Sequence, residues 1–107
     1  LIIRGVNVFP SQIEEQILRD PLLNGTYRLV LSRHGHLDEV EVMCELQQAV
    51  SDSLNEDRIK SISKELQHRI KTIVGISTKV SIMPFDSIPR TQMGKARRVF
   101  DTRPKLV

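Results

Sequence analysis

Two stretches in the first half of the chain alternate between apolar and polar residues, which is typical of strands with one buried face. Residues Tyr27–Arg33 and Glu39–Leu46 are the predicted strands, and His34-Gly35-His36 joins them as a hairpin with glycine at its centre. In the second strand the residues expected in the core are Val40, Val42, Cys44 and Leu46. Those expected to face solvent are Glu39, Glu41, Met43 and Glu45. The predicted sheet therefore has one solvated face and one face for helices to cover.

Two other stretches repeat apolar residues at helical spacing. The first is expected to start at Ser11 with a Ser-x-x-Glu capping box, to place Ile13, Ile17 and Leu18 on one face, and to stop at Asp20-Pro21. The second runs from Asn55 to Val74, with Ser53 and Glu56 as a further Ser-x-x-Glu start and Gly75 as its stop. Its apolar stripe consists of Ile59, Ile62, Leu66, Ile70 and Ile73. Both patterns predict amphipathic helices.

Short apolar segments complete the pattern. Residues 1–9 predict one or two short strands bent at Gly5, Asn24-Gly25 predicts a turn, and residues 78–84 predict a last core strand. The predicted order is βαββαβ. We therefore expect an α+β fold of two layers, with a mainly antiparallel sheet, two helices on one face and a basic C-terminal loop.

Length and composition fit one small globular domain. The chain has 107 residues, of which 39% are hydrophobic and 27% charged, so residues 1–107 can form a single modest core. No run reaches the roughly 18 apolar residues of a membrane span, and Arg4 interrupts the apolar N-terminus. The single cysteine, Cys44, is expected in the core as a small hydrophobic residue. These features predict a cytoplasmic domain with no membrane partner.

The positive charge is concentrated near the C-terminus. Residues 1–89 carry ten Lys and Arg against twelve Asp and Glu, whereas residues 90–107 carry six against one. Such a segment is compatible with a solvated tail, a polyphosphate ligand or a nucleic acid. Charge alone does not choose among them.

The candidate chemistry lies in the same segment, Ile88–Arg98, which is basic and loop-like. Pro89 and Gly94 bracket a tight excursion that would present Lys95, and Arg98 leads into a closing strand at Val99-Phe100. On the residues alone, a Gly-Lys pair in such a loop is more often a surface turn than a catalytic element.

Two motifs carry a family resemblance. Pro-Arg-Thr-x-x-Gly-Lys-x-x-Arg, from Pro89 to Arg98, resembles the C-terminal signature of adenylate-forming enzymes, which include acyl-CoA synthetases, luciferases and peptide-synthetase adenylation domains. The segment Arg4–Glu14 resembles the part of these enzymes that follows their interdomain hinge. Within this segment, the sequence Val-Asn-Val-Phe-Pro-Ser-Gln-Ile-Glu is similar to that of phenylacetate–CoA ligases within the family. The similarity extends from Leu1 to about Arg103.

The resemblance implies a C-terminal lid domain of an acid–CoA ligase, with ATP and coenzyme A as co-substrates, Mg²⁺ accompanying ATP, and an aryl carboxylic acid as substrate. Lys95 would be the catalytic residue of adenylation, and Gly5 and Arg98 would contact the cofactors. The partner would be a large N-terminal domain of the same polypeptide, which residues 1–107 do not include. The domain alone is therefore expected to be inactive.

Two other classes of function remain open on the residues alone. A βαββαβ order with a basic tail is shared with RNA-binding folds, but the aromatic strand motif that stacks bases is missing. A regulatory domain that binds a small metabolite has no positive support. The histidines, His34, His36 and His68, are interpreted as structural or solvated, with no metal site predicted.

Overall fold

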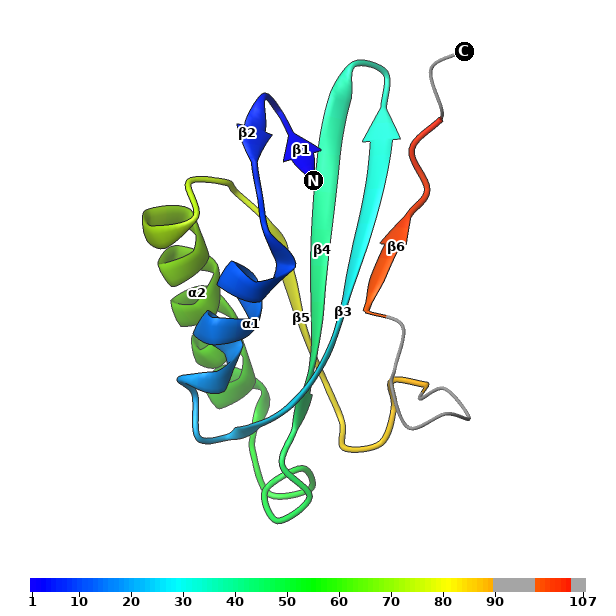
Figure 1. The fold of residues 1–107 in the computed structure, drawn as a ribbon. Helices are drawn as coiled ribbons and strands as arrows, with labels where there is room; N and C mark the ends of the chain where they lie inside the picture. The colour runs from blue at the N-terminus through cyan, green and yellow to red at the C-terminus, as the bar shows by residue number, and fades with distance from the viewer. Residues whose placement is uncertain (90–97, 105–107) are drawn as a thin grey trace.

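The structure is a computed structural model that describes residues 1–89 and 98–104. Figure 1 shows the order of its elements along the chain. They are β1 (Ile2–Ile3), β2 (Val6–Asn7), α1 (Pro10–Leu18), β3 (Leu23–His34), β4 (Leu37–Leu46), α2 (Glu56–Ile73), β5 (Lys79–Met83) and β6 (Val99–Asp101).

The main sheet has four strands in the order β5-β4-β3-β6, and β1 and β2 form a separate antiparallel pair. The longest pairing is the antiparallel hairpin β3–β4, in which Leu29 lies opposite Val42. The short strands β5 and β6 pair in parallel with β4 and β3, respectively. The sheet is therefore mixed, with an antiparallel centre and two parallel edges.

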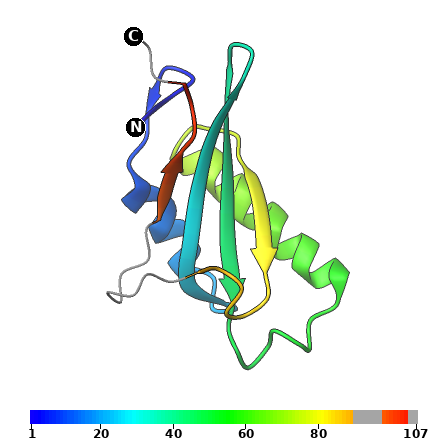
Figure 2. The ribbon, with the colours of Figure 1, turned by 90° about the vertical axis from the view of Figure 1, so that its right-hand side faces the viewer.

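Both helices cover the same face of this sheet (Figures 1 and 2). The core between the layers consists of alternate strand residues and the inward stripes of the helices. It includes Leu29, Leu31, Val40, Val42 and Cys44 from the strands, and Ile13, Ile17, Ile62, Leu66 and Ile70 from the helices. The two-layer α+β prediction is confirmed, as is Cys44 in the core, where burial raises the pKa of its thiol to about 12.

Both helices start differently from the prediction. Phe9 is the N-cap of α1, Pro10 occupies its first turn, and the Gln12 side chain accepts a hydrogen bond from the Phe9 N–H at 3.0 Å. Proline is favoured at this position because its fixed φ suits a helix and its missing N–H has no helical partner there. In α2, the Asn55 side chain accepts from the Arg58 N–H at 2.8 Å, so Asn55 and not Ser53 is the cap.

Three further expectations are corrected at the edges of the layers. Leu18 and Ile73 are each more than half exposed, because each lies at the last residue of its helix and outside the inward stripe. Asn24-Gly25 forms no turn between elements. It lies inside β3, where the register with β4 shifts between Leu23 and Tyr27 and Gly25 has a φ of +86°. The β3–β4 ladder is therefore irregular at this point, which is a common setting for glycine within a strand.

The segment that follows β5 crosses the face of the sheet opposite the helices (Figure 2). It must cross because β6 pairs with the far side of β3. Ile88 is buried in this crossing, and Glu45 beneath it is fully buried, so the prediction that Glu45 faces solvent is wrong. Among the described residues, no helix is long and apolar enough to cross a membrane.

Candidate functional site

Gly5 lies at the tip of the β1–β2 hairpin. The pairing of Ile3 with Val6 leaves Arg4 and Gly5 as a two-residue turn, with φ of 49° and 77°. Positive φ at both positions is typical of a type I′ turn, which favours glycine at its second residue. A Cβ atom added at Gly5 would meet no atom within 4 Å. The glycine is therefore required by backbone conformation and leaves an open surface above the turn.

A cluster of arginine and aspartate side chains holds this hairpin against the main sheet. Asp38, at the start of β4, accepts hydrogen bonds from Arg33 Nε at 2.8 Å, from Arg103 Nη1 at 3.1 Å and from the Arg4 backbone N–H at 3.3 Å. Arg103 also donates to the Ile2 carbonyl at 2.7 Å. The Asp38 and Arg103 side chains are each 13% exposed. The turn that carries Gly5 is thus fixed to the start of β4.

This network predicts an acid-sensitive contribution to stability. The hydrogen bond from Arg33 holds the pKa of Asp38 below its ordinary value of 3.8. Since the pKa is depressed in the folded state, the contribution is complete above about pH 4 and disappears as the pH falls through the folded-state pKa. We expect Asp38→Asn to lower the free energy of unfolding at pH 7 and to reduce its decline between about pH 4 and pH 2, as measured by urea unfolding.

The matched control for that measurement is Asp52→Asn, a change of the same charge at an exposed loop residue. This variant should keep both the stability and the pH dependence of the unmodified protein. Identical pH profiles for the Asp38 and Asp52 variants would contradict the role assigned to the network.

Arg98 lies directly before β6 and is tied to its own domain. Its Nη1 donates to Glu14 Oε1 at 2.8 Å, and its guanidinium carbon lies 5.1 Å from the centre of the Tyr27 ring. Its carbonyl accepts the Leu29 N–H. The Arg98 side chain is 48% exposed, so one side of the guanidinium still faces solvent. The contact with phosphate stays a prediction, and docking of the segment is the role that these contacts support.

Lys95 and the rest of the predicted loop, residues 90–97, lie outside the described residues. The segment is flanked by described residues on both sides, Pro89 at the end of the crossing segment and Arg98 at the start of β6. The role of Lys95 stays a prediction.

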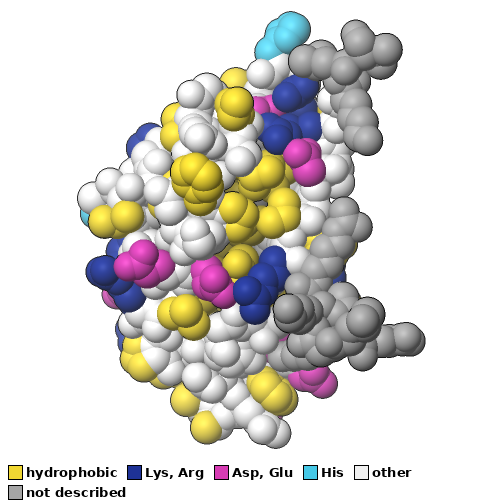
Figure 3. Space-filling model, in the orientation of Figure 1, with side chains coloured by type: hydrophobic (Ala, Val, Ile, Leu, Met, Phe, Trp, Pro, Cys, Tyr) yellow, Lys and Arg dark blue, Asp and Glu magenta, His cyan; other side chains and the backbone are white. Residues whose placement is uncertain are grey.

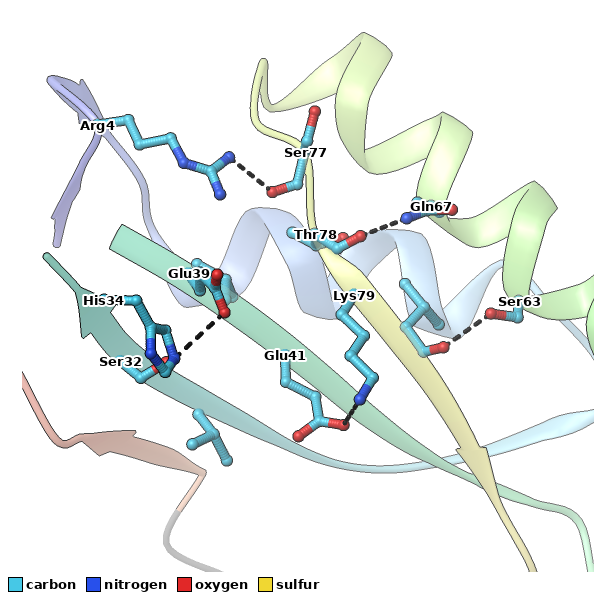
Figure 4. A pocket seen from close by; sticks show the side chains of 13 residues that line it. Arg4, Ser32, His34, Glu39, Glu41, Ser63, Gln67, Ser77, Thr78 and Lys79 are labelled. Carbon is cyan, nitrogen blue, oxygen red and sulfur yellow. Dashed lines mark hydrogen bonds and ion pairs between the residues drawn. The ribbon is translucent and has the colours of Figure 1, made fainter. Parts of the chain in front are cut away.

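An open pocket of about 640 Å³ lies beside the hairpin, and no pattern in the sequence predicted it. Figure 4 shows Arg4 reaching from the turn toward Ser77, whose carbonyl accepts from Arg4 Nη1 at 3.1 Å. Lys79 pairs with Glu41 at 3.7 Å across the same pocket. Because Lys79 is paired with Glu41 and Arg4 is bound to a backbone carbonyl, the pocket does not identify a ligand by itself.

Several large hydrophobic side chains are exposed. Figure 3 shows hydrophobic side chains gathered on one face of the molecule, the face turned to the viewer in Figure 1. Among the described residues, the large hydrophobic ones that are exposed belong to several parts of the chain rather than to a single element: Ile2, Phe9, Leu18, Leu37, Ile73 and Phe85. Gathered apolar side chains on a small domain are typical of an interaction surface.

Residues 5–103 match the family of AMP-binding enzyme C-terminal domains. The match covers most of the chain, and the chain belongs to this family.

Within this family, the chain is similar to phenylacetate-coenzyme A ligases. The chain is 50% identical over 103 residues to phenylacetate-coenzyme A ligase of Escherichia coli, which corresponds to 96% of this chain and 23% of that protein. A solved domain of phenylacetate-coenzyme A ligase from Bacteroides vulgatus superposes with a TM-score of 0.88 at 27% identity, covering 99% of this chain and 94% of that one. The C-terminal assignment made from the two motifs is therefore confirmed.

A third relative is larger and was solved with ligands. A structure of 2-hydroxyisobutyryl-CoA ligase, in complex with 2-HIB-AMP and CoA in the thioesterification state, superposes with a TM-score of 0.83 at 32% identity. The match covers 96% of this chain and 21% of that one. The chain thus spans about a quarter or less of these full-length relatives.

The sequence missed three polar features near the two motifs. They are the Asp38 network, the pocket beside Arg4 and the burial of Glu45. Asp38 and Arg103 are separated by 65 residues, and nothing in the local pattern around either one indicates the pairing. The alternation of β4 correctly predicts that Glu45 lies on the face opposite the helices. It does not predict that the segment after β5 covers this part of the face and buries Glu45.

Proposed function

We propose that this chain is the C-terminal domain of an AMP-forming acid–CoA ligase that uses an aryl acid of the phenylacetate type. The observation that carries the proposal is the 50% identity to a phenylacetate-coenzyme A ligase, extending over 96% of the chain. The partner is a large N-terminal domain of the same polypeptide that holds the substrates. The exposed hydrophobic side chains supply a surface for that domain.

The proposed reaction has two steps. A carboxylate oxygen of the acid attacks the α-phosphorus of ATP, giving an acyl adenylate and pyrophosphate. The sulfur of coenzyme A then attacks the acyl carbon, and AMP leaves with the electrons of the broken carbon–oxygen bond. Both steps build negative charge on oxygen atoms, so positioned cations and N–H groups lower their barriers.

The three predicted site residues divide between these steps. Lys95 places its ammonium group at the carboxylate and α-phosphate oxygens during adenylation, where it offsets the developing charge. Gly5 brings the backbone of the hairpin to the path of the coenzyme A thiol, which its missing side chain allows. Arg98 holds the end of the Lys95 segment through Glu14 and Leu29, with its exposed side available to phosphate.

Magnesium enters with ATP and is assigned to the N-terminal domain. The described part of this chain contains no group of three or more His, Cys, Asp or Glu side chains that could hold a metal ion. No step is therefore assigned to a metal bound by these residues.

The proposal predicts that activity depends on the longer polypeptide. A protein with both domains should convert ATP, phenylacetate and coenzyme A to AMP, pyrophosphate and the phenylacetyl thioester, and residues 1–107 alone should release no pyrophosphate. Coupled pyrophosphate assays on both proteins, at equal concentration, test this directly. Turnover by the 107-residue chain, or no thioester from the two-domain protein with any aryl acid, would contradict the proposal.

A further inference from the structure

Glu45 is a fully buried carboxylate on the face of the sheet that carries no helix. Strand alternation turns its side chain away from the core, and the segment that crosses this face of the sheet (Figure 2) binds it through the backbone N–H groups of Asp86 and Ile88. Burying a charged side chain costs free energy unless hydrogen bonds replace the lost water. The hydrogen-bond donors around Glu45 therefore show how a carboxylate is accommodated at this buried position.

At least three N–H groups converge on the two carboxylate oxygens. Oε1 accepts from Asn24 Nδ2 at 2.9 Å and from the Asp86 backbone N–H at 3.0 Å, and Oε2 accepts from the Ile88 backbone N–H at 2.8 Å. Asn24 is itself oriented, because its Oδ1 accepts the Thr26 N–H at 2.8 Å. Two of the three donors thus belong to the backbone of the crossing segment.

The crossing segment has a conformation that needs such support. Asp86 has a φ of +65°, which is uncommon for a residue other than glycine. The Ser87 N–H donates to the Pro84 carbonyl at 3.3 Å, and the Phe85 N–H donates to Ser51 Oγ at 2.8 Å. Backbone N–H groups gathered in a turn of this kind form a concave site for an anion. Here the anion is the Glu45 carboxylate.

We propose that Glu45 is a positioning residue for adenylation, one that fixes the start of the Lys95 segment against the sheet. This inference rests on the role proposed for Lys95. Ile88 lies seven residues before Lys95, and Arg98, three residues after it, is tied to Glu14 and Leu29. With Glu45 at one end and these contacts at the other, both ends of the segment are bound to the same rigid sheet. An ammonium group acts on a transition state only when it is held in place, so the start of the segment matters for the rate.

The chemistry of the side chain accounts for glutamate at this position. A carboxylate presents acceptors on both oxygens, whereas the amide of glutamine presents one acceptor and one N–H₂ donor. In Glu45→Gln, that donor would face either the Ile88 N–H or the donors at Oε1, so one end of the crossing segment would lose its partner. The variant keeps the size of the side chain, removes its negative charge and replaces one acceptor with a donor.

The test uses the two-domain ligase and measures the half-reactions separately. Glu45→Gln should lower the rate constant of acyl-adenylate formation by about tenfold or more, while coenzyme A attack on supplied acyl adenylate stays within about twofold of the unmodified enzyme. Glu41→Gln is the matched control, because Glu41 lies four residues earlier on the same strand face and its carboxylate accepts from Ser81 Oγ instead. That control should leave both half-reactions unchanged.

A double variant separates positioning from a general loss of stability. If Glu45 acts through Lys95, then Glu45→Gln should have no further effect on adenylation once Lys95 is already alanine. Hydrogen exchange gives a second readout. The amide protons of Asp86 and Ile88 should exchange faster in Glu45→Gln, whereas those of β3 and β4 should keep their protection.

The outcomes distinguish this proposal from the function on which it rests. If Lys95→Ala abolishes adenylation and Glu45→Gln does not slow it, Glu45 has no positioning role. If Lys95→Ala has no effect, the assignment of Lys95 fails first. Should Glu45→Gln not fold, Asn24→Ala removes one donor to the same carboxylate and should slow adenylation selectively. Equal loss of both half-reactions in Asn24→Ala would leave Glu45 as a stabilising residue and overturn the proposal.

Discussion

Lys95→Ala in the two-domain ligase should lower the rate of acyl-adenylate formation by at least about 10²- to 10³-fold, the cost typical of removing one charge-stabilising group. Attack of coenzyme A on a supplied acyl adenylate should proceed at nearly the unmodified rate. The reason is that the ammonium group is proposed to act only while negative charge develops around the α-phosphate, and an interaction made in one transition state affects that step alone.

Rapid-quench measurements under single-turnover conditions give both rate constants. Pyrophosphate formation from ATP and phenylacetate reports the first step, and thioester formation from synthetic acyl adenylate reports the second. Lys79→Ala is the control for loss of one positive charge, since Lys79 is an exposed lysine paired only with Glu41 at 3.7 Å among the described contacts. Equal impairment of both steps by Lys95→Ala would leave Lys95 a structural residue.

Gly5→Leu should produce the opposite pattern, with thioester formation reduced by about 10²-fold and adenylation nearly unchanged. The structure offers room for a Cβ atom at Gly5 within the domain, so a side chain there would project from the hairpin toward whatever the hairpin approaches. In the proposed second step that neighbour is the coenzyme A thiol. A bulky group would therefore obstruct thiol entry.

The strain of a side chain at positive φ must be separated from this obstruction. Gly35, in the β3–β4 turn, is a matched control because it has a φ of +64° and also meets nothing within 4 Å. Gly35→Leu should cost about 1 to 2 kcal/mol of stability, as Gly5→Leu does, and should leave both half-reactions intact. Gly5→Asn adds a side chain that tolerates positive φ, so it should still slow thioester formation. A slow second step in the Gly35 variant would assign the effect to strain.

Periodicity predicted most of the fold because each element buries one face against the same core. Val40 and Val42 at a spacing of two, and Ile62, Leu66 and Ile70 at a spacing of three to four, indicated their strand and helix without any tertiary information. The parallel pairing of the two edge strands was not specified. The residues of β5 and β6 do not indicate which central strand each of them pairs with.

The errors arose where two local signals competed or where a distant segment decided the outcome. The capping box expected at Ser11 overlaps a second start signal, formed by Pro10 and Gln12, and α1 begins at Pro10. Asn-Gly is a strong turn signal, but β3 pairs with β4 on both sides of it, so it forms an irregularity within the strand instead. The burial of Glu45 follows from a crossing that joins opposite edges of the sheet, and its donors lie 21 to 43 residues away in sequence.

The candidate site came from two motifs and their resemblance to a family, and its supporting contacts came only from the structure. Gly5 was predicted with its bend, which the hairpin confirms. The network that holds the hairpin was not predicted, because Asp38 and Arg103 are ordinary charged residues that lie 65 positions apart in the chain. These side chains acquire a role because the fold brings them together at the start of β4.

The arrangement of β4 has a kinetic consequence. Asp38, near its start, holds the glycine hairpin, and Glu45, near its end, holds the beginning of the lysine segment. Seven residues of extended chain separate these two anchors by about 23 Å, at roughly 3.3 Å per residue. Under the proposed function the two segments serve different steps at one active site, and anchors this far apart favour their entering it in turn. Every catalytic cycle then includes two reorientations of the domain, and turnover cannot exceed the slower of them. When that motion limits the rate, added solvent viscosity slows steady-state turnover while the isolated chemical steps keep their speed.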